Sequence, residues 1–168
     1  MQNKIFTERL NLNLLSLEDH DFIIAILNSP GWIEFIGDRN VHSKDDAIGY
    51  INKILSTQNL FYWVVSIKES NIPIGIISFL KRNYLEYFDI GFAFLPPFTG
   101  NGYACEAANE ILSVVSKKPE YHPVLATTLP QNENSIKLLT KLGLRFEKEI
   151  EVENEVLHIY TNAVEGYL

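Results

Sequence analysis

The sequence has 168 residues, of which 46% are hydrophobic and 21% are charged, and its formal net charge is −7. This balance is typical of a folded globular protein and excludes a largely disordered chain. No apolar run approaches the ~20 residues of a membrane-spanning helix, and the acidic charge argues against general nucleic-acid binding, whose affinity comes largely from neutralising phosphates.

The cysteine and histidine content argues against a disulfide framework and a metal site. Cys105 is the single cysteine, and residues 1–9 lack the apolar core of a secretory signal. We therefore expect a reducing, cytoplasmic setting. The histidines are scattered without the spacing of metal ligands, so we expect no metal. They are His20, His42, His122 and His158.

The first third of the chain predicts one strand and two helices. Residues 9–15 alternate apolar and polar side chains, as in a half-buried strand. Ser16 then caps a helix that ends at the turn signal in residues 28–31. A second helix begins after Ser43, where acidic residues suit a helix N-terminus. We expect these helices, with the aromatic-rich connector at residues 32–41, to form one wall of a cleft.

The middle of the chain predicts an antiparallel meander of three strands. Apolar runs at residues 60–67, 73–80 and 87–95 are separated by short turn segments. A helix at residues 102–117 then leads to a short apolar strand at residues 124–128. A strand, a crossover helix and another strand in this order indicate parallel pairing of the third and fourth of these strands.

The last part of the chain predicts a helix and a closing hairpin. Asn132 is a strong helix N-cap residue, and Gly143 suits the left-handed position that follows a helix. Residues 144–150 and 156–161 then form the hairpin. Because there are no repeats or linkers, we expect one α+β domain over residues 1–168.

Residues 91–107 carry the strongest functional signal, which is an apolar strand, two prolines, a glycine-rich turn and a helix start. Glycines let the backbone approach a ligand closely, and the first amides of a helix lack intrahelical partners at the positive end of its dipole. This order predicts a phosphate or pyrophosphate site. A Rossmann fingerprint is excluded because Cys105 takes the place of its third glycine, and a Walker loop because no Gly-Lys-Ser/Thr follows.

The element order and several motifs resemble the GCN5-related N-acetyltransferases (GNAT), in particular the RimJ/RimL-like branch that acetylates ribosomal-protein N-termini. Two runs resemble its acetyl-CoA loop, Asp89-Ile90-Gly91-Phe92 and Gly100-Asn101-Gly102-Tyr103-Ala104-Cys105-Glu106-Ala107. Two others resemble its N-x-x-S and K-x-G-F signature, Asn132-Glu133-Asn134-Ser135 and Lys141-Leu142-Gly143-Leu144. Two further runs resemble the opening motifs of this branch, Thr7-Glu8-Arg9-Leu10 and Phe35-Ile36-Gly37-Asp38-Arg39.

The resemblance implies a GNAT fold, with a mostly antiparallel sheet of about seven strands flanked by about four helices. It implies transfer of an acetyl group from acetyl-CoA directly to a primary amine, on a protein N-terminus or a small molecule, with coenzyme A as product. Two alternatives remain, namely a catalytically silent acyl-CoA-binding module and a binding protein that keeps the fold without the cofactor. The sequence does not choose the acceptor, and either a monomer or a homodimer is compatible with it.

We expect the cofactor to lie along the glycine loop, with its pantetheine arm paired to exposed backbone at Phe94 and Leu95. The expected cofactor contacts are Phe94, Leu95, Thr99, Gly100, Asn101, Gly102, Tyr103, Ala104, Asn132 and Ser135. Thr99 stands where the family usually has Gln, Arg or an aromatic residue, and residues 91–110 contain no Lys or Arg. Backbone amides must therefore hold the pyrophosphate, aided by the Thr99 hydroxyl, and charge for the 3′-phosphate has only two weak candidates, Lys137 and Lys141.

The resemblance also implies roles in catalysis. Ser135 is expected to donate a proton to the departing thiolate. Asn132 is expected to contact the pantetheine arm, although an N-cap explains it equally well. Asp89 is expected to remove the amine proton through water, and the alternative is a carboxylate exposed at the strand's start. His158 stands where an acidic residue is frequent, as a base or a packing residue, and Tyr160 follows it on the same strand.

The acceptor is expected to lie against aromatic residues of the connector and of the first meander strand, together with one arginine. The expected residues are Trp32, Phe35, Arg39, Tyr62 and Trp63.

Overall fold

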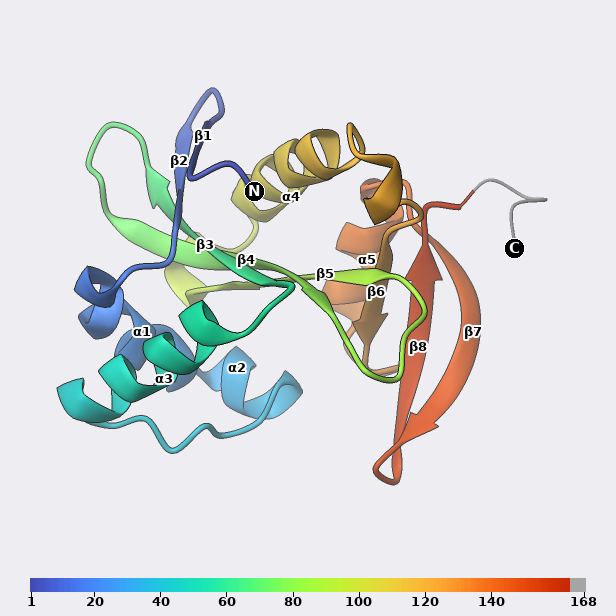
Figure 1. Cartoon of the computed structure of the whole chain (residues 1–168), viewed down its shortest axis with the longest axis horizontal. Coiled ribbons are helices and arrows are strands. Elements are labelled where there is room, and N and C mark those ends of the chain that lie inside the picture. The colour runs from blue at the N-terminus through green and yellow to red at the C-terminus, as the bar shows by residue number, and fades with distance from the viewer. Residues whose placement is uncertain (164–168) are drawn as a thin grey trace.

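The structure is a computed structural model that describes residues 1–163, in which five α-helices cover an eight-stranded sheet (Figure 1). The strands are β1 (Lys4–Phe6), β2 (Leu10–Leu14), β3 (Leu60–Ile67), β4 (Pro73–Lys81), β5 (Phe88–Phe94), β6 (Leu125–Thr128), β7 (Arg145–Val152) and β8 (Glu155–Thr161). The helices are α1 (His20–Leu27), α2 (Pro30–Phe35), α3 (Lys44–Ser56), α4 (Tyr103–Val115) and α5 (Glu133–Lys141). The strand order is β1-β2-β3-β4-β5-β6-β8-β7, and β5 and β6 form its parallel pair.

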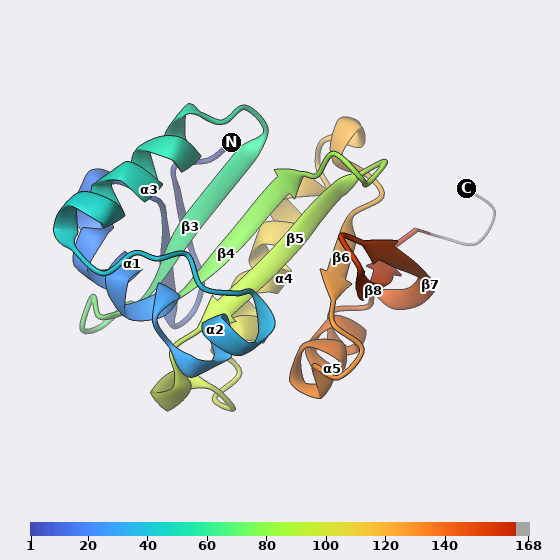
Figure 2. The ribbon, with the colours of Figure 1, turned by 90° about the horizontal axis from the view of Figure 1, so that it is seen from below.

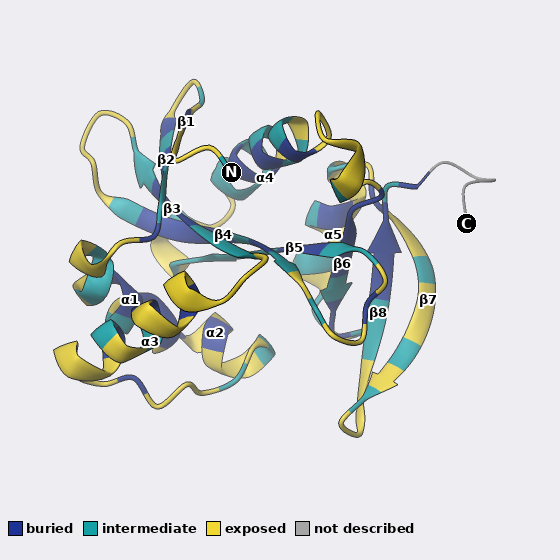
Figure 3. Ribbon diagram, in the orientation of Figure 1, coloured by how far each residue is buried: buried dark blue, intermediate teal, exposed yellow. Residues whose placement is uncertain are grey.

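Helices cover the two faces of the sheet as separate layers (Figures 1 and 2). α1, α2 and α3 pack on one face with Val64 and Ile76, whereas α4 and α5 pack on the other with Trp63 and Ile77. Neighbouring residues of β3 and β4 enter different layers because successive side chains of a strand point to opposite faces. Figure 3 shows that the central strands are mostly buried, whereas β7 at the sheet edge is largely exposed.

The sheet opens between β5 and β6. The two strands pair at Asp89 and Leu125 and then diverge toward their carboxyl ends, as Figure 2 shows. We call the divergence of residues 90–95 from residues 126–129 the fork. α4 leads from the end of β5 to β6, so the start of this helix lies at the open end of the fork.

Most of the predicted elements are confirmed. β3, β4 and β5 form the predicted meander, β5 and β6 are parallel, and β7 and β8 form the closing hairpin. The Ser43 hydroxyl accepts a hydrogen bond from the Asp46 N–H and caps α3 as predicted. No helix within residues 1–163 is long and apolar enough to cross a membrane.

Two elements differ from the prediction. β1 was not predicted. It has three residues with one buried side chain, Ile5, and so short a strand shows no alternation of apolar and polar residues. α2 begins inside the predicted turn and extends into the connector. Pro30 occupies its first turn, where the missing N–H has no intrahelical partner in any case.

Candidate active site

The open edge of β5 in the fork presents the backbone groups of Phe92 and Phe94. The Leu95 N–H donates to the Ile74 carbonyl of β4 at 2.9 Å. Backbone groups of successive residues point to opposite sides of a strand, so those of Phe92 and Phe94 point away from β4 and into the fork. The Leu95 carbonyl accepts from the Phe98 N–H at 2.9 Å. Both backbone groups of Leu95 are therefore bonded within the protein, whereas exposed backbone was expected at this residue.

The opposite edge of the fork is held by a side chain at its narrow end. The Thr127 N–H of β6 donates to Oδ1 of Asp89 on β5 at 2.9 Å. A carboxylate thus accepts the hydrogen bond at the point where the backbone ladder between the two strands stops. This contact fixes the narrow end of the fork.

Asp89 is buried, with 1% of its surface exposed. Its Oδ2 accepts a hydrogen bond from Nε of Arg82 at 2.7 Å, in an ion pair whose arginine side chain is 33% exposed. The alternative of a solvent-exposed carboxylate is therefore wrong. Burial raises the pKa of Asp89 above its ordinary value, although Arg82 and the Thr127 N–H act in the opposite direction. Arg82 and Thr127 thus hold both oxygens of the carboxylate.

The glycine loop forms a left-handed turn directly before α4. Gly100 and Gly102 have φ values of 77° and 80°, a region that strains residues with a side chain, and Gly102 is the N-cap of α4. The Thr99 hydroxyl donates to the Pro96 carbonyl at 2.9 Å. This differs from the expectation that it would serve the pyrophosphate, because its proton is used inside the loop.

A segment from the N-terminus holds this loop from outside. Glu106, in the first turn of α4, accepts hydrogen bonds from the Thr7 hydroxyl at 2.6 Å, the Arg9 N–H at 2.9 Å and the Arg9 Nε at 2.7 Å. Nη1 of Arg9 donates to the Asn101 carbonyl at 3.1 Å, and the guanidinium carbon lies 4.6 Å from the centre of the Tyr103 ring. We call Thr7, Arg9 and Glu106 the clamp.

The clamp places a guanidinium, paired with Glu106, beside a loop whose own sequence has no Lys or Arg, and sequence reasoning missed it. Burial pushes the pKa of Glu106 upward, but the hydrogen bonds from Thr7 and Arg9 outweigh it and hold the pKa below its ordinary value. Lys137, one of the two expected cations, pairs with Glu133 at 3.4 Å and is 72% exposed, and Lys141 is also exposed. The available signal was the opening motif that contains Arg9.

α5 begins as predicted, with Asn132 as its N-cap. The Asn132 Oδ1 accepts a hydrogen bond from the Ser135 N–H at 3.1 Å, which leaves the Asn132 amide nitrogen available to a ligand. Ser135 is half-buried in the first turn. Nε2 of His158 lies 3.3 Å from a Glu149 oxygen, and its Nδ1 is buried with no hydrogen-bond partner within residues 1–163. Tyr160 is buried in the layer of α4 and α5.

The expected acceptor wall lies mostly on the face of α1, α2 and α3. Trp32 is buried and Tyr62 is half-buried in this layer. Burial raises the pKa of the Tyr50 hydroxyl, and nearby Tyr62 adds to this while Arg39 opposes it, which places the three side chains together. Trp63 lies elsewhere, because it alternates with Tyr62 and points to the opposite layer, where its Nε1 donates to the Gln2 carbonyl at 3.1 Å. Phe35 is half-buried at the end of α2.

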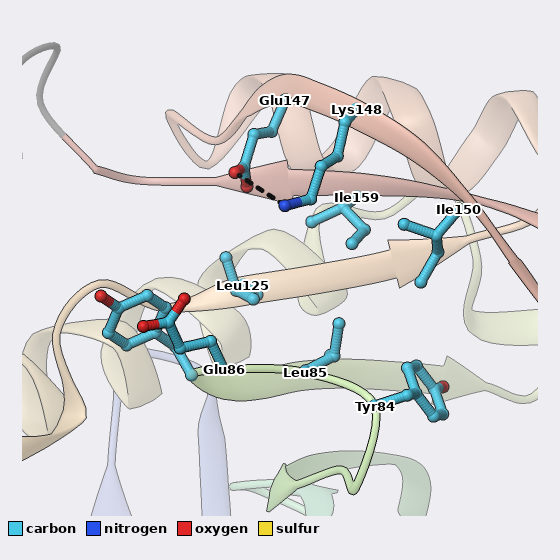
Figure 4. A pocket seen from close by; sticks show the side chains of 9 residues that line it. Tyr84, Leu85, Glu86, Leu125, Glu147, Lys148, Ile150 and Ile159 are labelled. Atoms are coloured by element: carbon cyan, nitrogen blue, oxygen red, sulfur yellow. Dashed lines mark ion pairs between the residues drawn. The ribbon is translucent and has the colours of Figure 1, made fainter. Parts of the chain in front are cut away.

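A pocket of about 440 Å³ lies beside the narrow end of the fork (Figure 4). Its middle is apolar and its ends carry polar groups, and the lining residues are Tyr84, Leu85, Glu86, Tyr87, Leu125, Glu147, Lys148, Ile150 and Ile159. Leu125 is the residue that pairs with Asp89 across the two strands. At one end, Nζ of Lys148 lies 3.6 Å from a Glu147 oxygen. The pocket therefore shares Leu125 with the narrow end of the fork.

Residues 9–145 match the model of the acetyltransferase (GNAT) domain family. The chain belongs to the GNAT family. It is 29% identical over 164 residues to YnaD, an uncharacterized N-acetyltransferase of Bacillus subtilis (strain 168), with 95% of each chain covered. The GNAT family expected from the sequence is thus confirmed. Residues 1–163 contain eight strands and five α-helices, where about seven strands and about four helices were expected.

Two solved structures share the fold of this GNAT chain at lower identity. The ribosomal-protein-S5-alanine acetyltransferase of Vibrio fischeri superposes with a TM-score of 0.75 at 18% identity, covering 99% of this chain and 100% of that one. The microcin C7 self-immunity acetyltransferase MccE, solved with acetyl-CoA and AMP, superposes with a TM-score of 0.80 at 15% identity and covers 94% of each chain.

Proposed function

We propose that this GNAT protein transfers an acetyl group from acetyl-CoA to a primary amine on a protein N-terminus or a small molecule. The observation that carries the proposal is the fork, whose free backbone edge opens beside a glycine loop at the start of α4. The solved complex of MccE with acetyl-CoA supports the choice of cosubstrate within this fold. Acetyl-CoA supplies the acetyl group as a thioester and leaves as the thiol.

The residues around the fork fit acetyl-CoA. The first helical hydrogen bond of α4 runs from the Glu106 N–H to the Gly102 carbonyl at 3.0 Å, so the preceding amides have no intrahelical partner and are available to phosphates. The free groups of Phe92 and Phe94 suit the amides of the pantetheine arm. A backbone N–H in the fork also polarises the thioester carbonyl, as the donors of an oxyanion hole do.

Asp89 is the proposed general base. A primary amine is mostly protonated near neutral pH and must lose a proton before its nitrogen attacks the carbonyl carbon. Asp89 lies at the narrow end of the fork, and burial raises its pKa toward the range of a useful base. Asp89 takes this proton directly or through water, and the neutral amine then forms the N–C bond as the C–S bond breaks, losing its second proton to solvent.

Residues at the start of α5 are proposed to serve the leaving thiolate. Ser135 donates a proton to the sulfur in a general-acid role and regains one from solvent. Asn132 contacts the pantetheine arm through its amide nitrogen, because its oxygen already caps the helix. The two roles assigned to Asn132 from the sequence are therefore compatible.

The acceptor is proposed to approach from the face of α1, α2 and α3. Tyr62 and Arg39 line one side of the approach, and the pocket beside Leu125 lies on the other. The floor of the pocket is aliphatic and its rim includes Glu86 and Glu147. This combination suits an amine with an apolar body and disfavours an anionic one.

Two measurements test the proposal. Calorimetry with coenzyme A must show binding, since no heat and no thermal shift at millimolar coenzyme A would exclude every acyl-CoA function. Release of free thiol from acetyl-CoA must then depend on an added primary amine. Binding without release, across a panel of peptides and small amines, would instead favour the catalytically silent module of the same fold.

A further inference from the structure

We propose that Arg9 is a positioning residue for acetyl-CoA, which it serves by fixing the glycine loop rather than by contributing net charge. The inference rests on the proposed function, because it assigns the loop to the cofactor phosphates. It makes the N-terminal segment, 97 positions away from Glu106 in the chain, a part of the cofactor site.

The contacts of Arg9 join three points that would otherwise move separately. Its backbone N–H and Nε both donate to Glu106 in the first turn of α4, and its Nη1 donates to the Asn101 carbonyl in the loop. The guanidinium also lies over the Tyr103 ring. One planar side chain therefore ties the loop, the helix start and the segment before β2 to one another.

The hydrogen bond to Asn101 determines which way the loop amides point. The peptide between Asn101 and Gly102 is trans, and in a planar trans peptide the N–H points opposite to the carbonyl. Since Arg9 holds the Asn101 carbonyl on its own side, the Gly102 N–H points away from Arg9. The clamp thus keeps an amide donor directed to the other side of the loop, ahead of the unpaired first amides of α4.

The charges in the clamp show why position matters more than charge here. Glu106 is ionised and pairs with Arg9 at 2.7 Å, so the clamp is close to neutral as a unit. A neutral unit adds little attraction for a polyanion. Its contribution is therefore the preorganisation of backbone donors, which removes an ordering cost from binding.

The test compares Arg9→Met, which keeps an apolar stem and removes the donors, with Lys4→Met on the neighbouring strand. Lys4 is exposed and the substitution removes the same charge. Loss of a charge-assisted hydrogen bond predicts a coenzyme A dissociation constant raised about tenfold or more in Arg9→Met. Lys4→Met is expected to bind coenzyme A like the wild type. Both affinities are measured by calorimetry, independently of turnover.

A second cosubstrate separates positioning from general damage to the fold. S-acetylpantetheine lacks the pyrophosphate, so Arg9→Met is expected to use it at the wild-type rate while its KM for acetyl-CoA rises. Arg9→Lys, which keeps the charge but lacks the planar donors, is expected to resemble Arg9→Met. Wild-type coenzyme A affinity in Arg9→Met or Arg9→Lys, or an equal loss with S-acetylpantetheine, would overturn the inference. Absence of coenzyme A binding by the wild type would instead defeat the proposed function.

Discussion

Two carboxylates at opposite ends of the same site, Asp89 and Glu106, have pKa values shifted in opposite directions. Each is paired with an arginine from another segment, Arg82 and Arg9 respectively, at 2.7 Å. Burial raises the pKa of Asp89, whereas the pKa of Glu106 is lowered although burial also pushes it upward. The pairing partner is the same kind of residue, so the difference must come from the surroundings.

The surroundings differ chiefly in how far each carboxylate is exposed to water. Asp89 is 1% exposed and accepts hydrogen bonds from Arg82 and Thr127. Glu106 has a side chain that is 19% exposed and accepts hydrogen bonds from the Thr7 hydroxyl and from two groups of Arg9. A fully desolvated carboxylate is suited to exchange a proton, whereas a partly hydrated one that keeps its hydrogen bonds is suited to stay ionised. We infer that Asp89 serves the chemistry and Glu106 serves cofactor binding.

The largest expected effect is on turnover in Asp89→Asn. Asparagine can still accept from the Thr127 N–H but cannot take up a proton. We expect kcat to fall roughly 10³-fold, within the usual range for loss of a general base. The coenzyme A dissociation constant, measured by calorimetry, should stay near the wild-type value. A kcat close to that of the wild type would remove Asp89 from the chemistry, and thermal unfolding serves as the control for the lost ion pair.

The pH dependence of turnover should distinguish the two carboxylates. Asp89 must be ionised to act, and its pKa is raised. As the pH is lowered, kcat should therefore begin to fall at a pH above the ordinary aspartate pKa of about 3.9, and it should then fall about tenfold for each pH unit. Glu106 has a lowered pKa, so the stability it contributes is present above the ordinary value of about 4.3 and is lost only below it.

The check lowers the pH stepwise and measures two quantities. The first is kcat of the wild type at saturating acetyl-CoA. The second is the coenzyme A dissociation constant of Arg9→Met divided by that of the wild type. The ratio cancels the titration of the ligand. We expect kcat to fall while the ratio holds. If the ratio falls to one at a higher pH than the fall in kcat, the roles assigned to Asp89 and Glu106 would be reversed.

Glu106→Gln should affect binding and spare turnover. A neutral glutamine pairs weakly with Arg9, so the loop loses its external support. We expect the KM for acetyl-CoA to rise about tenfold while kcat at saturation is unchanged. Steady-state kinetics with acetyl-CoA at several concentrations makes the distinction. A large loss of kcat at saturation would show that Glu106 takes part in the chemistry.

The smallest expected effect is in Thr7→Val, which removes one of the three hydrogen bonds to Glu106 and also the acceptor of the Leu10 N–H at 3.0 Å. One ordinary hydrogen bond contributes about 1 kcal/mol, so we expect the coenzyme A dissociation constant to rise roughly fivefold. The dissociation constant is measured by calorimetry. As a control, kcat at saturating acetyl-CoA is expected to be unchanged. A loss larger than that of Glu106→Gln would point to a separate role for the Thr7 hydroxyl.

Local patterns in the sequence were enough to predict most helices and strands and the glycine loop before α4. The period-two runs located the meander, and Asn132 and Ser43 marked the starts of two helices, because capping depends on residues a few positions apart. The faces of the strands were harder to assign. Alternation separates Tyr62 from Trp63 but does not say which side of the sheet receives the acceptor.

Contacts between distant segments could not be predicted from periodicity. Arg9 and Glu106 meet only because β2 and the start of α4 lie side by side in the folded chain, and no local pattern encodes their pairing. Burial of Asp89 has the same origin, since Arg82 and the Thr127 N–H come from the preceding turn and from β6. The folded chain therefore decides between the two readings of Asp89 left open by the sequence, and it brings a distant arginine beside the glycine loop.

The most direct test of the account is transfer of isotopically labelled acetyl from acetyl-CoA to a panel of primary amines and to a cell extract, with products identified by mass spectrometry. Wild type and Glu106→Gln are compared with Asp89→Asn at saturating acetyl-CoA. We predict the same labelled amine from the wild type and Glu106→Gln at similar rates, and almost none from Asp89→Asn. Labelled product from Asp89→Asn at the wild-type rate, or no labelled amine from a wild type that binds coenzyme A, would contradict it.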